Sequence, residues 1–480
     1  MTWIVIYNTL QWLVRIIMLA VVLRRRRDPA ATLAWLTIIF FEPFVGTAIY
    51  ALIGERRLGR RRRRLYRSVM VATRTPERRD AQLRHVVRPE LGQTGADVIA
   101  QSETYGGMPI LGGNSVELVV DTEQMVERLI EDIHRAHHHV HMVFYIVVDD
   151  ETGRRVFQAL VEAAARGVAC RVLADHGGSW RFFRRGGLAS QVRRRGVDIR
   201  PCLPVNPLSR RLARLDLRNH RKLVVIDNEI GYAGSQNLVN PDYGHRRAGP
   251  WHDLMGRFRG PVVSQLQTVF LEDWMFETGK LIDEPLLGRP MASRGDMAAQ
   301  VVATGPTDRD EAFEAIPRVL LAAINSARWR IILTTPYLIP DETTLMALSL
   351  AVDRGVQVDV VVPHRVDQVL VQAAARYYYD RLIDIGVNLY LHHEGLLHAK
   401  TITIDDSFAL LGSTNLDRRS FYLNFELNVL MYGPQITREL RFAQTRYLSE
   451  SSPIDAHAWR NRPLLVRYGH AGAALFSPLL

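Results

Sequence analysis

The sequence has very few cysteines and no dense cluster of acidic residues. Its two cysteines, Cys170 and Cys202, exclude a disulfide framework and any zinc or iron–sulfur centre built from cysteine. Without an acidic cluster to hold a pair of metal ions, we expect neither a metal nor another cofactor. The 480 residues are 47% hydrophobic and 23% charged. These values exclude a wholly disordered chain and predict more than one globular core.

Lysine is nearly absent as well. Only three of the 61 basic residues are lysines, and these are Lys222, Lys280 and Lys400. Arginine has replaced nearly every lysine in this chain. A lysine that persists under this bias is consistent with a tight site that needs a compact ammonium group. Chance survival of three lysines is the alternative.

The net charge of +11 is concentrated near the amino terminus. Residues 1–70 hold thirteen arginines against Asp28, Glu42 and Glu55, so the other 410 residues are close to neutral. A nucleic-acid-binding protein spreads positive charge over its contact face, so nucleic acid is not an expected partner. The arginine blocks are instead expected to bind anionic membrane lipids, at roughly 1 kcal/mol per arginine near the surface.

Two apolar runs precede the neutral region. Trp3–Leu23 has the length of a membrane span, and Ala30–Ile53 is interrupted at Glu42-Pro43. Because no cleavage site follows the first run, residues 1–60 are predicted to be an uncleaved membrane anchor with two hydrophobic segments. A tilted or re-entrant second segment would keep both arginine blocks on the cytoplasmic side. Two core helices of a soluble domain are the alternative.

The region after the anchor contains an internal duplication. Residues 61–113 are expected to form a linker, and residues 114–290 and 291–480 to form two similar halves. Strand, helix and strand follow one another between Val140 and Leu173, and again between Arg330 and Val362. Each copy predicts a β-α-β unit with parallel strands and a right-handed crossover.

Each half also carries the same spaced pattern, H-x-K-x4-D-x6-G-S-x-N. Six fixed positions repeated at equal spacing make coincidence negligible. Two of the three lysines occupy its K position. The predicted site residues are His220, Lys222, Asp227, Ser235 and Asn237 in the first copy, and His398, Lys400, Asp405, Ser413 and Asn415 in the second.

The chemistry of this pattern suits a phosphodiester. Histidine and lysine two residues apart on a strand point to one face, and a hairpin at Asn228-Glu229 returns Gly234-Ser235 to the same place. Lysine and asparagine can contact nonbridging phosphate oxygens while a neutral histidine attacks phosphorus. A second histidine must protonate the leaving oxygen, and the two copies supply one histidine for each role.

Several other residues have predicted supporting roles. A nucleophilic histidine needs an acceptor on its other ring nitrogen, and Asp253 and Glu426, about thirty residues beyond the histidine of each half, are the candidates. Asp227 and Asp405 are expected to fix the loops or strand ends more than to touch phosphate. The runs His137-His138-His139, His141 and His392-His393 are expected at the surface rather than at a metal.

The paired pattern resembles the phospholipase D superfamily. Its surroundings narrow the resemblance to the bacterial cardiolipin synthases: Arg218–Lys222, Leu397–Lys400, Gly412–Phe421, Thr335-Pro336-Tyr337, Leu33–Leu36 with Pro43 and Gly46, and Ser477–Leu480. The resemblance implies a fold class of α/β, with two tandem α-β-α halves related by a pseudo-twofold axis behind a membrane hairpin. It implies an enzyme of the bacterial inner membrane.

The resemblance also implies the reaction. One phosphatidylglycerol would transfer its phosphatidyl group to His220 and release glycerol, and His398 would act as acid and then as base. A second phosphatidylglycerol would attack the phosphohistidine and yield cardiolipin. A phospholipase D-type phosphodiester hydrolase, in which water replaces the lipid alcohol, is the alternative.

Overall fold

The computed structural model describes residues 2–24, 29–54, 60–205, 217–244, 248–282, 291–305 and 314–477. Some sequence-based expectations fall on residues outside these ranges. They concern the arginines at 25–27, 56 and 57, the half boundary at 290/291 and the tail at 478–480, and the side chains of residues 60–64 are likewise not described.

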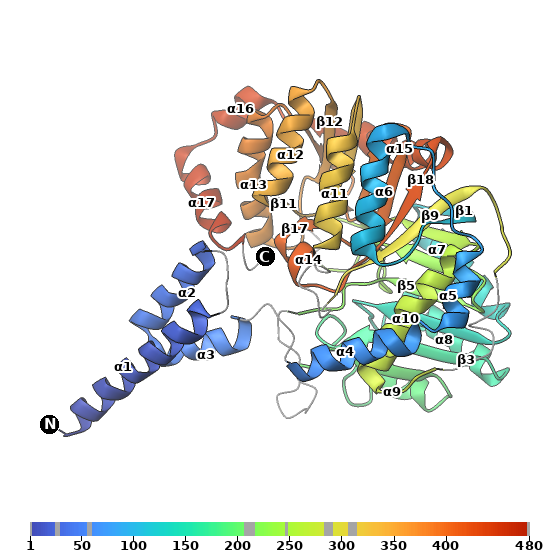
Figure 1. Ribbon diagram of the computed structural model, residues 1–480, viewed down its shortest axis with the longest axis horizontal. Helices are drawn as coiled ribbons and strands as arrows, with labels where there is room; N and C mark the ends of the chain where they lie inside the picture. The colour runs from blue at the N-terminus through green and yellow to red at the C-terminus, as the bar shows by residue number, and fades with distance from the viewer. Residues whose placement is uncertain are drawn as a thin grey trace.

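One continuous mixed sheet of 15 strands runs through the catalytic body (Figure 1). The strands of the first half are, from the edge inward, β4 (Asp198–Cys202), β3 (Ala169–Asp175), β2 (His139–Phe144), β5 (Leu223–Ile226), β6 (Ile230–Gly234), β8 (Met255–Arg259) and β1 (Leu111–Val119). The second half continues with β9 (Met297–Ala303), β18 (Leu427–Tyr432), β16 (Phe408–Gly412), β15 (Thr401–Ile404), β10 (Arg330–Thr334), β12 (Gln357–Pro363), β13 (Asn388–His392) and β19 (Ser451–Pro453).

The two halves repeat one strand order around the antiparallel β1–β9 pair. Reading outward from that pair, β8, β6, β5, β2, β3 and β4 correspond to β18, β16, β15, β10, β12 and β13. The pairs β2–β3 and β10–β12 are parallel, joined through α8 (Glu151–Ala165) and α12 (Glu342–Asp353). The predicted β-α-β units and the pseudo-twofold fold class are therefore confirmed.

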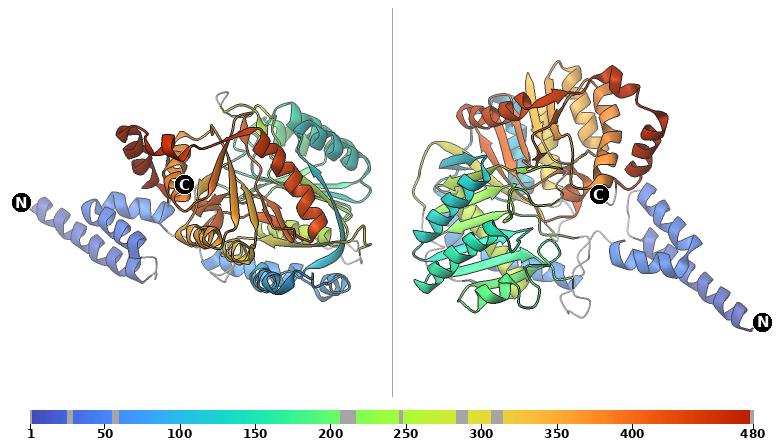
Figure 2. Two further views of the ribbon diagram at one scale, coloured as in Figure 1. Left: turned by 90° about the horizontal axis from the view of Figure 1, so that it is seen from above. Right: turned by 180° about the vertical axis from the view of Figure 1, so that it is seen from behind.

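Helices cover both faces of the sheet (Figure 2). Among the described helices, five begin at an aspartate whose carboxylate accepts a backbone N–H in the first turn: Asp121 before α7 (Thr122–His134), Asp150 before α8, Asp341 before α12, Asp417 before α14 (Arg418–Tyr422) and Asp455 before α16 (Ala456–Arg460). The others in the body are α9 (Leu188–Arg193), α10 (Val262–Thr278), α11 (Ala315–Ser326), α13 (Val369–Asp384), α15 (Pro434–Ser449) and α17 (Leu464–Ala474).

Three large apolar clusters form the core. One belongs mainly to the second half and one to the first, while the third takes residues from both. In this shared cluster, Leu223 and Val263 of the first half pack with Leu411 and Leu427 of the second. A core that spans the junction fixes the two halves relative to each other, so side chains from both can form one site.

The amino-terminal helices project from the body as an arm (Figure 1). They are α1 (Thr2–Leu23), α2 (Pro29–Phe41) and α3 (Pro43–Ile53), and the break at Glu42-Pro43 falls where the sequence predicted it. Among the described helices, one apolar stretch, Trp3–Leu23, is long enough to cross a membrane, and Ala31–Phe41 is shorter. The Arg15 guanidinium in α1 donates to the Phe40 carbonyl oxygen at 2.9 Å, which joins the two segments.

The stretch that the sequence predicts as a linker is largely helical. It contains α4 (Arg60–Thr73), α5 (Pro76–Leu83) and α6 (Gly92–Gly106). Helix α4 lies against α10 of the first half, and α6 lies against α11 of the second. Residues 61–113 thus pack on both halves of the protein.

Candidate active site

Each predicted histidine lies on a short segment that pairs with the opposite half. His220 donates its backbone N–H to the Phe425 carbonyl oxygen at 2.8 Å, next to a parallel bridge between Asn219 and Phe425. In the mirrored arrangement, the N–H of His398 donates to the His252 carbonyl oxygen at 2.8 Å, beside the parallel pair of β14 (Leu396–Leu397) and β7 (Trp251–His252). These crossed segments bring both imidazoles to the junction of the halves.

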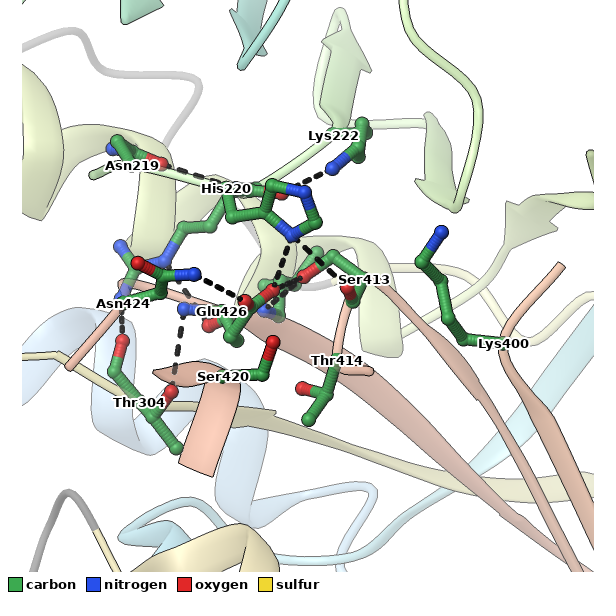
Figure 3. Close-up of polar contacts among 12 residues, drawn as sticks. Asn219, His220, Lys222, Thr304, Lys400, Ser413, Thr414, Ser420, Asn424 and Glu426 are labelled. Carbon is green, nitrogen blue, oxygen red and sulfur yellow. Dashed lines mark hydrogen bonds and ion pairs between the residues drawn. The ribbon is translucent and has the colours of Figure 1, made fainter. Parts of the chain in front are cut away.

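Because the histidine segments pair with the opposite half, each imidazole also meets a carboxylate from the opposite half. Nδ1 of His220 lies 3.0 Å from Glu426 Oε2 and 3.1 Å from the Ser413 carbonyl oxygen (Figure 3). Nδ1 of His398 lies 2.6 Å from Asp253 Oδ1. The two candidate carboxylates therefore contact the imidazoles, but each contacts the histidine of the other half rather than its own.

The predicted serines bind the carboxylates. Ser235 Oγ donates to Asp253 Oδ1 at 2.6 Å, and Ser413 Oγ donates to Glu426 Oε2 at 2.5 Å. Each hydroxyl oxygen in turn accepts a backbone N–H at 2.9 Å, from the residue after the carboxylate. Both serines are fully buried, so they fix the carboxylate that fixes the ring.

The two predicted lysines are buried beside the histidines. Lys222 Nζ donates to the His220 carbonyl oxygen at 2.7 Å, and Lys400 Nζ donates to the His398 carbonyl oxygen at 2.5 Å. Figure 3 shows both ammonium groups on the same side of the His220 ring. Burial lowers the pKa of Lys222 to about 8 and that of Lys400 well below its usual range, with the neighbouring Lys222 adding to the latter shift. An anion bound beside these two amines favours their charged forms, so the pair suits an anionic ligand.

The predicted asparagines line the same pocket as the histidines. The pocket has a volume of about 220 Å³ and is lined by His220 and His398 together with Asn237 and Asn415. Asn237 Oδ1 accepts the N–H of Ile146, while Asn237 Nδ2 and Asn415 Oδ1 are buried and have no hydrogen-bond partner within the described ranges. Buried amide atoms of this kind are available to a ligand.

Both imidazoles are neutral at pH 7 in this environment. Burial lowers the pKa of His220 to about 4, against an opposing effect of Glu426. Burial and then Lys400 lower that of His398 to about 3. Burial alone would raise the pKa of Asp253, but His398 and Lys400 bring it to about 2. A neutral imidazole held at Nδ1 by an ionised carboxylate presents a nucleophilic Nε2.

The aspartates of the repeated pattern lie away from the pocket. Asp227 accepts the backbone N–H groups of residues 137–139 at 2.7–2.8 Å, and Asp405 accepts those of residues 328–330 at 2.9–3.0 Å. Both have a left-handed backbone, with φ of 52° and 48°. They fix the hairpin after the lysine strand to the start of the neighbouring strand.

Three histidines expected at the surface are buried, so that expectation was wrong for them. His139 and His141 point from β2 under α10, where the His141 ring stacks on Phe270 at 4.2 Å. His392 is buried against Glu450, 3.1 Å from its carboxylate. His139 and His141 lie on β2, an inner strand of the sheet, whereas His392 ends β13, next to the edge strand β19. In the described part of the chain, no group of three or more His, Cys, Asp or Glu side chains is placed to hold a metal ion.

Sequence reasoning missed several pocket residues and the ion pairs behind them. Tyr145, Arg218, Tyr243, Trp251 and Asp367 also line the pocket. The Tyr145 ring meets the His220 ring edge-on at 4.8 Å, and Trp251 lies 4.4 Å from the ring of His398. The only signal in the sequence was proximity, since Arg218 precedes the first pattern and Trp251 precedes Asp253.

Arg221 makes a buried ion pair within the first half and also ties the first pattern to the second half. Arg221 Nη1 lies 2.5 Å from Asp273 Oδ1, and both side chains are almost fully buried. The same guanidinium donates to the carbonyl oxygens of Thr304 and Glu426 across the junction. It thereby holds the strand that carries Glu426 beside His220.

Comparison with known proteins agrees with this geometry. A family model described as "Cardiolipin synthase, PLD-like domain" matches residues 129–274 and 320–444, and one described as "Phospholipase D-nuclease N-terminal" matches residues 13–55. Cardiolipin synthase A of Erwinia tasmaniensis is 36% identical, over 100% of this chain and 99% of that protein. Cardiolipin synthase A of Salmonella arizonae is 35% identical, over 99% of both.

A solved structure shares the fold. The phosphatidylserine synthase of Haemophilus influenzae Rd KW20 superposes with a TM-score of 0.61 at 14% identity, covering 81% of this chain and all of the other.

Proposed function

This chain belongs to the cardiolipin synthase family of the phospholipase D superfamily and is a phosphatidyltransferase, and we propose that it condenses two phosphatidylglycerol molecules into cardiolipin and glycerol. The observation that carries the proposal is a single pocket lined by His220 and His398, with Nδ1 of each ring held by a carboxylate. None of the described residues bonds Nε2 of either ring, which leaves that nitrogen for a phosphate group.

In the first half-reaction, Nε2 of His220 attacks the phosphorus of phosphatidylglycerol. The N–P bond forms as the bond from phosphorus to the glycerol oxygen breaks, and His398 gives its proton to that oxygen. Lys222 and Lys400 neutralise the charge that develops on the nonbridging oxygens. Glu426 stabilises the positive charge on the modified His220 ring.

In the second half-reaction, a hydroxyl of another phosphatidylglycerol attacks the phosphohistidine. His398, now neutral, accepts the hydroxyl proton as the new P–O bond forms and the N–P bond breaks. The free pocket holds two neutral imidazoles, so the acid form of His398 must arise when substrate enters. The negative phosphodiester supplies the reason, because an anion between the rings raises the pKa of both.

The arm formed by α1–α3 fits delivery of a lipid substrate. We place the chain in the bacterial inner membrane, held by α1 and the broken second segment, with anionic lipids bound by the arginine-rich blocks.

Phosphatidylglycerol vesicles with labelled head groups test the function. The expected products are glycerol and cardiolipin in equal amounts, and phosphatidic acid as the main product would instead identify a hydrolase. His398→Ala protein denatured at alkaline pH, where the N–P bond of phosphohistidine is stable, should carry a phosphatidyl adduct, formed slowly, and His220→Ala protein should carry none. An adduct on His398 in the His220→Ala protein would reverse the two roles.

A further inference from the structure

The catalytic groups obey the pseudo-twofold symmetry, but the surrounding pocket wall does not. Arg218 lies two residues before His220, and the equivalent position before His398 is Leu396. Burial and Asp175 raise the pKa of Tyr145 to about 12, while the nearby Arg419 and Arg218 oppose the shift, which places both guanidinium groups near this ring. Tyr145 contacts His220. The wall on the His220 side therefore carries two guanidinium groups, of which Arg218 is paired with the buried Asp175 at 3.3 Å, and the Asp417 carboxylate also lines the pocket.

The wall on the His398 side is aromatic and carries a carboxylate. Trp251 contacts the His398 ring, and Tyr243 meets Trp251 edge-on at 5.6 Å. Burial raises the pKa of Tyr243, and Asp367 is near enough to add to the shift despite Arg181. Asp367 follows β12 in the loop that leads to α13, at the carboxyl end of a parallel strand where ligands commonly bind.

Asp367 is held in place but not neutralised. Tyr337 Oη donates to Asp367 Oδ1 at 2.6 Å, and Gln368 Nε2 donates to Tyr337 Oη at 3.4 Å. Within the described ranges, Asp367 Oδ2 accepts no hydrogen bond and no cationic side chain pairs with this carboxylate. Asp367, Tyr337 and Gln368 all line the pocket. A fixed carboxylate oxygen without a donor, on a pocket wall, is an acceptor for a ligand.

The charge of this wall restricts what it can bind. A carboxylate repels phosphate, so the phosphodiester is expected beside the two lysines and away from Asp367, and the group at Asp367 must donate hydrogen bonds. In the proposed reaction, the leaving alcohol and the attacking alcohol must both lie opposite His220, since both bonds to phosphorus are made and broken in line. Both alcohols are glycerol head groups, so one subsite can serve each in turn.

We propose that Asp367, positioned by Tyr337 and flanked by Gln368, binds the free hydroxyls of the glycerol head group and sets the preference for polyol acceptors. This inference rests on the proposed function and adds a specificity-determining subsite to it. A site that hydrogen-bonds a hydroxyl discriminates against an analogue that lacks it, because the half-buried Asp367 then loses that hydrogen bond.

Soluble alcohols test the subsite directly with the full-length protein in phosphatidylglycerol vesicles. Isotope-labelled glycerol, 1-propanol and ethanolamine are each supplied as acceptors, and phosphatidyl transfer is measured as label entering the lipid, because transfer to glycerol regenerates phosphatidylglycerol. In transfer, the N–P bond to His220 breaks, the alcohol oxygen bonds to phosphorus, and its proton goes to His398. We expect Asp367→Asn to lower the ratio of glycerol transfer to 1-propanol transfer by roughly tenfold or more.

Asp384→Asn is the matched control, because Asp384 is an exposed carboxylate at the far end of α13, paired with Arg460. It should leave the ratio unchanged. Should Asp367→Asn fail to fold, Tyr337→Phe keeps the carboxylate but removes its donor, and should lower the ratio by a smaller factor.

Two outcomes would overturn the inference. One is an unchanged ratio in a folded Asp367→Asn protein, and the other is a greater loss with ethanolamine than with glycerol, which would identify an ammonium site. Failure of the proposed function would look different, because the wild-type protein would then form phosphatidic acid instead of cardiolipin.

Discussion

The crossed carboxylates predict unequal effects of Glu426→Gln and Asp253→Asn. Nδ1 of His220 has two acceptors, Glu426 and the Ser413 carbonyl oxygen, whereas Nδ1 of His398 has Asp253 alone within the described ranges. Removal of the charge from Glu426 should therefore leave the His220 tautomer intact. The same change at Asp253 allows the His398 ring to reverse its tautomer.

The local hydrogen bonds allow the Glu426→Gln side chain to fit. Glu426 Oε1 accepts from Asn424 Nδ2 at 3.3 Å, and Asn424 Oδ1 has no partner in the described part of the chain. If the Asn424 amide turns over, it can accept from the NH₂ group that the substitution introduces, and the remaining side-chain oxygen stays on His220 and Ser413. The variant then keeps these hydrogen bonds but loses their charge, and a hydrogen bond to a charged group is worth about 1–1.5 kcal/mol more than a neutral one, which is roughly a 5- to 13-fold loss of rate.

Asp253→Asn should lower the rate of cardiolipin formation more than Glu426→Gln does. Loss of the correct tautomer in a carboxylate–histidine pair lowers kcat by about 10⁴ in serine proteases, so a loss between about 10² and 10⁴ is expected here. Initial rates of cardiolipin formation in phosphatidylglycerol vesicles measure both. Glu450→Gln, at a carboxylate–histidine pair away from the pocket, is the matched control and should leave the rate unchanged. An equal or larger loss in Glu426→Gln would refute the reasoning.

Three further predictions follow from the buried charges. At pH 7 a phosphate-like anion such as tungstate should bind with proton uptake, and its affinity should fall as pH rises. The reason is that the pocket imidazoles, with pKa values of about 4 and 3, are neutral until the anion binds. Calorimetric binding heats that do not depend on the buffer would contradict the proton uptake. Asp227→Ala should lower the free energy of unfolding by at least about 1–2 kcal/mol, because three N–H contacts are lost, and should keep activity per folded molecule within about threefold. Lys222→Ala should abolish activity, and comparable activity losses in the two variants would instead show that Asp227 acts in catalysis. Asp273→Ala should lower the free energy of unfolding in denaturant by about 3–5 kcal/mol, because Arg221 stays charged and buried without this carboxylate. The double replacement Arg221→Met/Asp273→Leu should recover part of that loss. A single variant as stable as wild type would exclude a structural role for the pair.

The rarity of lysine gains meaning from the fold. Lys222 and Lys400 are buried within the pocket region, while Lys280 is exposed at the end of α10. At the two buried positions, the ammonium group reaches only as far as the carbonyl oxygen two residues earlier. A guanidinium is larger and planar and would need more room between the strands. The exposed Lys280 has no such constraint and no assigned role.

The sequence by itself determined the elements that depend on local order. Strand and helix periodicity located the β-α-β units, and Glu42-Pro43 located the break in the second apolar segment. The spacing of the repeated pattern brought histidine and lysine together, although both lie just before β5 and β15 rather than on a strand face. Each of these follows from residues a few positions apart, whose geometry is set by the backbone itself.

Only the tertiary structure decided which half completes which histidine. Sequence singled out Asp253 and Glu426 as partners of an imidazole but could not reveal the exchange between halves, because the residues that meet are 206 and 145 positions apart. The asymmetric wall with Asp367 was hidden for the same reason. Packing of the shared core sets the positions of the two halves relative to each other. A local sequence pattern does not predict how two similar halves face each other across a pseudo-twofold axis.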